Sequence, residues 1–170
     1  MLATSTETRF NMNDMYKGIP PGYVVLPGAG FTEVNGPMYV CRKGGKLIFG
    51  LRVEPRHANV MGTCHGGMLM LLADMQLPLA AHYQAGLDDR FLPTVNLTAD
   101  FLASPAVGDW IWGETDVVRV TRNLVFTQGI FRVEDKPVLR ANGIFKRTGA
   151  AAPDDGKPNV ARMLASLSFD

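Results

Sequence analysis

The sequence predicts an α+β fold in which one antiparallel sheet wraps around a single long central helix. Residues 65–84 form a long run that is apolar on nearly all helical faces, and segments with the pattern of β-strands lie on both sides of it. A helix of this kind cannot lie against solvent. The simplest way to bury it is to surround it with the sheet.

Two strand-like runs precede the helix. Pro37–Arg42 and Lys46–Val53 are joined by Lys43-Gly44-Gly45, a sequence typical of a tight turn. These runs predict a β-hairpin.

The central helix is expected from about His65 to Gln84, after the loop Glu54–Cys64 and before Gly86, which ends it. Pro78 lies inside this helix and has no N–H to donate to the carbonyl four residues earlier. We therefore expect a bend, or a carbonyl bonded to water, at this point.

Four further strands are expected after the helix. They are Thr94–Leu102, Trp110–Val120, Leu124–Val133 and Val138–Arg147. The turn-forming runs Thr121-Arg122-Asn123 and Asp135-Lys136-Pro137 separate the last three strands. The first strand alternates apolar and polar residues, which predicts two different faces.

The two ends of the chain differ from this core. Residues 1–22 are expected to be an N-terminal extension with one short helix over Asn11–Lys17, and residues 149–170 a loose tail with a short helix near Val160–Leu167. A single core domain would then occupy residues 23–148, with no internal repeat.

Composition excludes several classes of function. The chain has 170 residues, 46% of them apolar, and a net charge of +1, so neither nucleic acid nor an anionic membrane is expected as a partner. Asp74, Gln76 and Pro78 interrupt the apolar helix, which argues against a membrane span. Two cysteines without metal-type spacing, and a start that does not resemble a signal peptide, favour a soluble cytoplasmic protein.

The loop before the helix and one carboxylate within it carry the chemical signal. His57–Gly67 (HANVMGTCHGG) is a polar, glycine-rich loop that runs into the helix, where free N–H groups can bind an anion or an oxyanion. Asp74 follows among leucines and methionines, where it is a candidate base. Together they suggest acyl chemistry.

These residues resemble the signature of hotdog-fold acyl-CoA thioesterases, in particular the PaaI-type branch of the 4-hydroxybenzoyl-CoA thioesterase superfamily. The resemblance rests on N-x-x-G-x-x-H-G-G, on an aspartate eight residues after the first paired glycine, on Thr94–Phe101 (TVNLTADF) and on Ser104–Asp109 (SPAVGD). It extends from about residue 35 to residue 148.

The resemblance implies a set of catalytic roles. Asn59 and Gly66 would hold the thioester carbonyl, Asp74 would act as nucleophile or general base, Thr94 would orient water, and His65 would support the loop. Each residue also has a structural interpretation. Asn59 is a turn-former, His65 can bond nearby backbone, Gly66 permits close packing, Thr94 is an ordinary strand residue, and Asp74 can point outward.

The resemblance also implies an acyl-CoA substrate and no metal or redox cofactor. Arg119, Arg122 and Arg147 are candidate contacts to the phosphates of coenzyme A, although a solvated face explains them equally well. A Cys64–His65 dyad is disfavoured because neighbours at a helix start point in different directions.

Helix geometry adds a constraint once these roles are granted. Gly66 and Asp74 are eight residues apart on one helix, which is about 12 Å at 1.5 Å per residue. One chain cannot therefore supply both groups to one thioester. The expected catalytic unit is a homodimer, or a homotetramer built from such dimers, with the site at the subunit interface.

Two other functions fit the same fold. One is a hotdog dehydratase or hydratase, which usually pairs a catalytic histidine with an acidic helix residue; the present loop with Asp74 fits hydrolysis better. The other is a non-catalytic acyl-CoA sensor, which would carry a DNA-binding segment. No helix-turn-helix pattern or basic extension is recognisable in residues 1–22 or 148–170.

Overall fold

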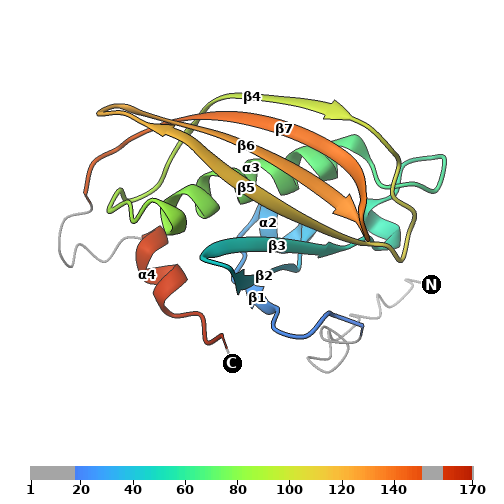
Figure 1. Cartoon of the computed structure of the whole chain (residues 1–170). Helices are drawn as coiled ribbons and strands as arrows, with labels where there is room; N and C mark the ends of the chain where they lie inside the picture. Colours follow the sequence, from blue (N-terminus) through green and yellow to red (C-terminus); the bar gives the residue numbers. More distant parts are fainter. Residues whose placement is uncertain (1–17, 151–158, 170) are drawn as a thin grey trace, which may run out of the picture.

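The computed structural model describes residues 18–150 and 159–169. In this part of the chain a seven-stranded sheet curves around the helix α3 (Gly66–Gln84), as Figure 1 shows. Neighbouring strands are antiparallel, in the order β1-β2-β3-β5-β6-β7-β4. The predicted α+β arrangement of one sheet wrapped around one central helix is confirmed.

The predicted hairpin before the helix is confirmed. β2 (Met38–Lys43) pairs with β3 (Lys46–Arg52) across a turn whose two residues, Gly44 and Gly45, have φ of 57° and 76°. Residues with side chains rarely adopt such positive φ values, so the two glycines permit this turn. β3 then joins the later strands by pairing with β5.

The strands after the helix form a meander with one exchange of position. β5 (Trp110–Val120), β6 (Leu124–Val133) and β7 (Lys136–Lys146) follow one another in the sheet, whereas β4 (Thr94–Phe101) pairs with β7 and forms an edge. β4 therefore has one side of its backbone unpaired by the described chain.

One predicted turn is displaced in the structure. The turn between β6 and β7 lies at Glu134 and Asp135, and β7 begins at Lys136 rather than at Val138. Glu134 adopts a φ of 52°, and the register shifts between Phe131 and Arg132, so that Pro137 pairs with Arg132 at an irregularity. A proline is accepted there because a regular ladder hydrogen bond is not required.

Several short elements complete the fold. β1 (Val24–Leu26) and α2 (Phe31–Asn35) precede the hairpin, and the 3-10 turn η1 (Pro55–His57) precedes the loop. The predicted C-terminal helix is present as α4 (Val160–Ala165), which Asn159 caps by accepting the N–H of Arg162. The helix expected over Asn11–Lys17 lies outside the described residues.

The helix α3 has a buried side and a half-exposed side. Close approach to the sheet is possible because β5 has a glycine there: a Cβ on Gly113 would lie 2.3 Å from Oε1 of the fully buried Gln76. The opposite side of α3 carries a stripe that the described chain covers only partly. This half-exposed stripe consists of Met70, Leu71, Asp74, Met75 and Pro78.

The helix continues without interruption from Gly66 to Gln84, with Pro78 inside it. The bend or water-bonded carbonyl expected at Pro78 stays a prediction. No helix in the described ranges is both long and apolar enough to cross a membrane.

Candidate functional site

The loop before α3 is closed by the side chain of Asn59. Its Oδ1 accepts the N–H groups of Met61 (2.9 Å) and Thr63 (3.3 Å), and its Nδ2 donates to Oγ1 of Thr63 (3.0 Å). A bridge between Ala58 and Cys64 closes the same loop. These contacts show Asn59 in the turn-forming arrangement that asparagine favours.

His65 is the N-cap of α3. Its backbone is extended, with φ −65° and ψ 136°, and its Nδ1 accepts the N–H of Gly67 at 2.8 Å. Its carbonyl accepts the N–H groups of Met68 (2.9 Å) and Leu69 (3.3 Å). The imidazole therefore orders the helix start by bonding nearby backbone, and this bond fixes the direction in which the ring points.

The same bonds leave the backbone N–H of Gly66 free to donate to a ligand. Within the described residues no hydrogen bond uses the Gly66 N–H, while the N–H groups of the next three residues all bond to His65. This N–H lies at the positive end of the α3 dipole, where an anionic oxygen is stabilised. The ring of Phe101 lies beside it: a Cβ on Gly66 would be 3.2 Å from Cε1 of Phe101.

The structure brings Asp74 and Thr94 together. Thr94 begins β4, and its Oγ1 donates to Oδ1 of Asp74 at 2.6 Å. Asp74 is half-buried on the half-exposed stripe, and Thr94 is exposed. The carboxylate is thus held by a hydroxyl and still reaches the surface of the chain.

The structure does not bring Asp74 to Gly66. Both belong to one continuous helix, and eight residues of α-helix span about 12 Å. The distance is far beyond the reach of a base that activates water beside the Gly66 N–H.

Cys64 is not arranged as a nucleophile. It is buried, its Sγ lies 3.8 Å from the His65 carbonyl oxygen, and burial raises the pKa of its thiol to about 11. The thiol is therefore protonated at neutral pH, and a Cys–His dyad is not formed because Nδ1 of His65 is bonded to Gly67.

His57 is a buried loop residue. Its Nδ1 accepts the Glu54 N–H at 3.0 Å, and burial lowers the pKa of its imidazole, which keeps the ring neutral at pH 7. In residues 18–150 and 159–169, no three His, Cys, Asp or Glu side chains are grouped as metal ligands would be.

A cavity of about 320 Å³ adjoins the start of α3; we call it the loop cavity. It extends between α2, the loop and the first turns of α3. Its lining combines apolar side chains with the histidines and backbone of the loop: Phe31, Asn35, Arg56, His57, Ala58, His65, Gly67, Met68 and Leu71. An apolar group of a ligand bound at the helix start has space there.

The three candidate arginines differ in their surroundings. Arg147 forms an ion pair with Asp89, with Nη2 at 2.8 Å and Nε at 2.9 Å from Oδ2. Arg119 and Arg122 are exposed at the β5–β6 end, and their side chains form no hydrogen bond or ion pair with any described residue. Arg147 is therefore occupied within the fold, and the other two remain accessible to a ligand.

Asp89 is a structural centre that sequence reasoning missed. It is fully buried, and besides Arg147 it accepts the Gly149 N–H through Oδ1 at 2.7 Å. These bonds tie the segment that leads into Thr94 to the end of β7. In the sequence, Asp89 stands between Asp88 and Arg90 and is indistinguishable from a solvated charge.

Known proteins share this architecture. A family model described as the thioesterase superfamily matches residues 61–139. A Pseudomonas aeruginosa protein named "Putative esterase PA0474" is 30% identical over 130 residues, which are 75% of this chain and 96% of that protein.

Solved structures show the same fold at lower identity. The PaaI protein from the phenylacetic acid degradation operon of E. coli has a TM-score of 0.60 and 21% identity, covering 68% of this chain and 86% of that one. Smu.793 of Streptococcus mutans, bound to acetyl CoA, has a TM-score of 0.59 and 19% identity, covering 66% and 90%. These likenesses confirm the predicted hotdog fold.

The Asp89–Arg147 pair gives a prediction for acid stability. Burial disfavours the charged form of Asp89, but the bonds from Arg147 and Gly149 outweigh it and hold the pKa of this carboxyl below its ordinary value. A carboxyl with a lowered pKa stabilises the fold above the unfolded pKa of about 4, and this stabilisation is lost as pH falls through the folded pKa. Asp89→Asn is expected to lower the free energy of unfolding at pH 7 by about 2–4 kcal/mol.

Urea unfolding between pH 3 and pH 7 checks this expectation. The Asp89→Asn variant should lose less of its remaining stability below about pH 4 than wild type, because the titrating group is gone. Asp88→Asn is the matched control, since Asp88 is exposed and lies 3.6 Å from the same guanidinium. Equal stability and equal pH dependence of Asp89→Asn and wild type would contradict a role for this pair.

Proposed function

Since the chain belongs to the thioesterase superfamily, we propose that it is an acyl-CoA thioesterase, which hydrolyses an acyl-CoA to a free acid and coenzyme A. The observation that carries the proposal is the open N–H of Gly66 at the start of α3, on the same helix as Asp74, whose carboxylate accepts a hydrogen bond from Thr94 of β4. The Gly66 N–H suits a developing oxyanion, and the Asp74 carboxylate suits the activation of water.

In the proposed mechanism the thioester carbonyl oxygen accepts a hydrogen bond from the Gly66 N–H. Negative charge grows on this oxygen as the carbonyl carbon becomes tetrahedral, and a fixed donor at the positive end of a helix stabilises that charge. His65 and Asn59 act as positioning residues, because their bonds shape the loop and leave this donor free. The acyl group occupies the loop cavity.

Asp74 supplies the other half of the reaction. As a general base it takes a proton from water, and the water oxygen bonds to the carbonyl carbon. The carbon–sulfur bond then breaks, and the proton passes from Asp74 to the sulfur, so that coenzyme A leaves as the thiol. As a nucleophile Asp74 would first displace the coenzyme A thiolate to form a mixed anhydride, which water then hydrolyses to the free acid. The Thr94 hydroxyl, 2.6 Å from Oδ1, orients the carboxylate in both routes.

The two halves come from different subunits in this proposal. Gly66 and Asp74 of one helix are about 12 Å apart, so Asp74 serves the thioester held by the Gly66 of a second copy. The exposed surface supports a homodimer. Within the described residues β4 is an unpaired edge with Val95 59% and Phe101 54% exposed, and α3 carries the half-exposed stripe, whose members other than Asp74 are apolar. Apolar surface of this kind commonly marks an interface.

The arrangement favours hydrolysis over the dehydration alternative. A dehydratase of this fold uses a histidine in catalysis, whereas Nδ1 of His65 is bonded to Gly67 as a helix cap. Arg119 and Arg122 are the proposed contacts to the phosphates of coenzyme A, and Arg147 is a weaker candidate because Asp89 already binds it. Chemistry at the thioester itself needs no metal in this scheme.

The first prediction concerns the base. Asp74→Asn should lower kcat/KM for thiol release from acyl-CoAs by at least about 100-fold, because the amide cannot take a proton from water. Thr94→Val should lower it less, by about tenfold, through loss of one hydrogen bond. A panel of short, long and aromatic acyl-CoAs supplies the substrates.

Asp116→Asn provides the matched control for the carboxyl-to-amide change, because Asp116 pairs with Lys46 on the surface of β5. It should retain wild-type activity. Undiminished hydrolysis by Asp74→Asn would exclude Asp74 from the mechanism, and the absence of turnover by wild type on any thioester would favour the acyl-CoA sensor.

The second prediction isolates the backbone donor. Gly66→Pro removes the N–H, and proline is well tolerated at the first helical position. His65 already has the extended backbone that a residue before proline adopts. This variant should fold, and its kcat should be about 10²–10³-fold lower than that of wild type.

Gly66→Ala is the matched control, because it adds the Cβ that meets Phe101 but keeps the N–H. It should stay within about tenfold of wild type, well above the proline variant. Equal activity of the alanine and proline variants would show that the Gly66 N–H does not bind the oxyanion.

A further inference from the structure

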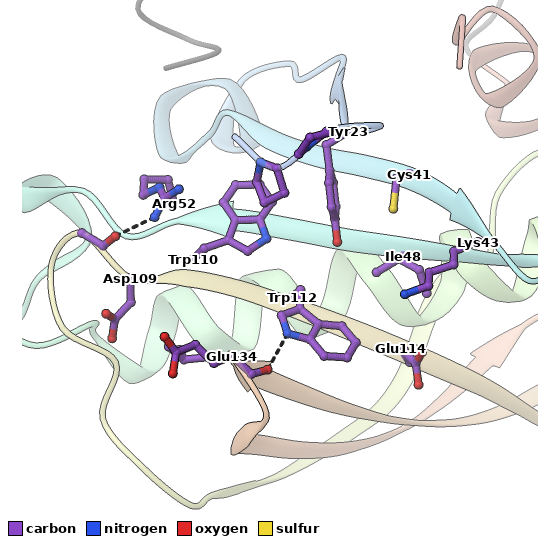
Figure 2. A pocket seen from close by; sticks show the side chains of 14 residues that line it. Tyr23, Cys41, Lys43, Ile48, Arg52, Asp109, Trp110, Trp112, Glu114 and Glu134 are labelled. Atoms are coloured by element: carbon purple, nitrogen blue, oxygen red, sulfur yellow. Dashed lines mark hydrogen bonds between the residues drawn. The ribbon is translucent and has the colours of Figure 1, made fainter. Parts of the chain in front are cut away.

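A second hollow lies on the outer face of the sheet, as Figure 2 shows; we call it the outer hollow. It has a volume of about 620 Å³ and is formed by β2, β3 and β5, with Pro20 and Pro21 from the segment before β1. Gly113 of β5 faces Gln76 of α3, so its neighbours Trp112 and Glu114 point to the opposite face. The outer hollow is therefore separated by the sheet from α3.

Aromatic side chains form much of its lining. Trp110 and Trp112 are alternate residues on one face of β5, and Tyr23 meets Trp110 edge-on, with ring centroids 5.0 Å apart and planes at 82°. The indole of Trp110 lies across β3 because residue 50 is glycine: a Cβ there would lie 2.1 Å from the ring. The backbone of β3 thus permits this aromatic arrangement.

The two indoles already attract cations. The guanidinium of Arg52 lies 5.3 Å from the Trp110 ring, and that of Arg132 lies 5.3 Å from the Trp112 ring. Both distances are within the range of a cation–π contact. Arg52 is also held by the Gly108 carbonyl, to which it donates at 2.7 Å.

One carboxylate beside these rings has no direct partner. Glu114 is half-buried at one end of the outer hollow, and its carboxylate forms no hydrogen bond or ion pair with the described residues. Lys46 is not its partner, because the Lys46 ammonium is bound to Asp116 at 2.7 Å. A partly desolvated carboxylate of this kind is stabilised by a cation that enters beside it.

The other charged groups of the lining balance in sign: Asp109 and Glu134 are carboxylates, and Lys43 and Arg52 are cations. Asp109 already accepts the Ala106 N–H and Arg52 already donates to the Gly108 carbonyl, so the Glu114 carboxylate decides the sign of ligand that the hollow favours. Lys43 is exposed and lines the same hollow, so an anionic ligand is the competing possibility that the experiment must separate.

We propose that the outer hollow binds a small aromatic amine, with the ring against the aromatic lining and the ammonium beside Glu114. The ring would contact Trp112 and Tyr23, and the ammonium would gain the Glu114 carboxylate, since Arg52 and Arg132 already lie over the indole rings. The site does not depend on the thioesterase proposal, because it uses neither Gly66 nor Asp74.

The tryptophans make the test selective. The chain has two tryptophans, and both line the outer hollow, so indole N–H resonances and tryptophan fluorescence report on this place alone. Phenethylamine is the probe, and 3-phenylpropionate is the control with the same ring and the opposite charge. Phenethylamine should shift both indole resonances saturably. Its Kd should be at least about tenfold lower than that of 3-phenylpropionate.

Glu114→Gln should weaken the binding of phenethylamine at least about tenfold. Glu33→Gln, the same change at an exposed position of α2, should leave binding unchanged. Asp74→Asn should also bind normally, which separates this test from the thioesterase test. No saturable shift, equal or tighter binding of 3-phenylpropionate, or unchanged binding by Glu114→Gln would overturn the proposal.

Cys41 gives a measurement on wild type that needs no variant. Its half-buried thiol lines the outer hollow, whereas Cys64 is buried elsewhere. Saturating phenethylamine should slow modification of Cys41 by a disulfide reagent at least about threefold, since the ligand covers the thiol. An unchanged rate would count against occupancy of the hollow.

Discussion

The rigidity of one helix constrains the whole site. α3 runs without a break from Gly66 to Gln84, so the donor at its start and the carboxylate two turns later stay about 12 Å apart. No loop movement within one chain can bring them to the same carbonyl. A hydrolytic mechanism that uses both groups therefore requires two copies of the chain, and this requirement links catalysis to assembly.

The surrounding structure holds each half-site separately. At the helix start, Asn59 accepts two N–H groups of the loop, His65 accepts the N–H of Gly67, and the Gly66 N–H has no partner among the described residues. At the other half-site, Thr94 holds Asp74, while buried Asp89 anchors the segment that leads into Thr94. Preorganisation of this kind matters because a fixed donor or base needs little rearrangement as the reaction proceeds.

Much of the fold could be predicted because its main elements have strong periodic patterns. The hairpin at Gly44-Gly45, the helix after His65 and the alternating strand from Thr94 were all predicted within a few residues. β1 and α2 have three and five residues, too few for a periodic pattern to be recognised. The turn at Glu134 was displaced because Pro137 suggested a turn but pairs at a register shift.

The candidate site was predictable in composition but not in its contacts. The motif placed Gly66 and Asp74 on one helix, and the structure adds the bond from Thr94 and the open N–H. The motif could not place Arg147, because its partner Asp89 is 58 residues away in sequence. Contacts over such separations depend on the register of β7 and on the loop after α3, which local patterns do not encode.

Complementation between two inactive variants tests the shared site most directly. Asp74→Asn and Gly66→Pro chains, co-expressed with different tags, should each be nearly inactive alone, while a mixed dimer keeps one intact site. Random pairing makes half of the dimers mixed, so the mixture should recover about one quarter of wild-type activity per chain. Activity no higher than that of the separate variants, in a mixture shown to contain mixed dimers, would contradict a site shared between subunits.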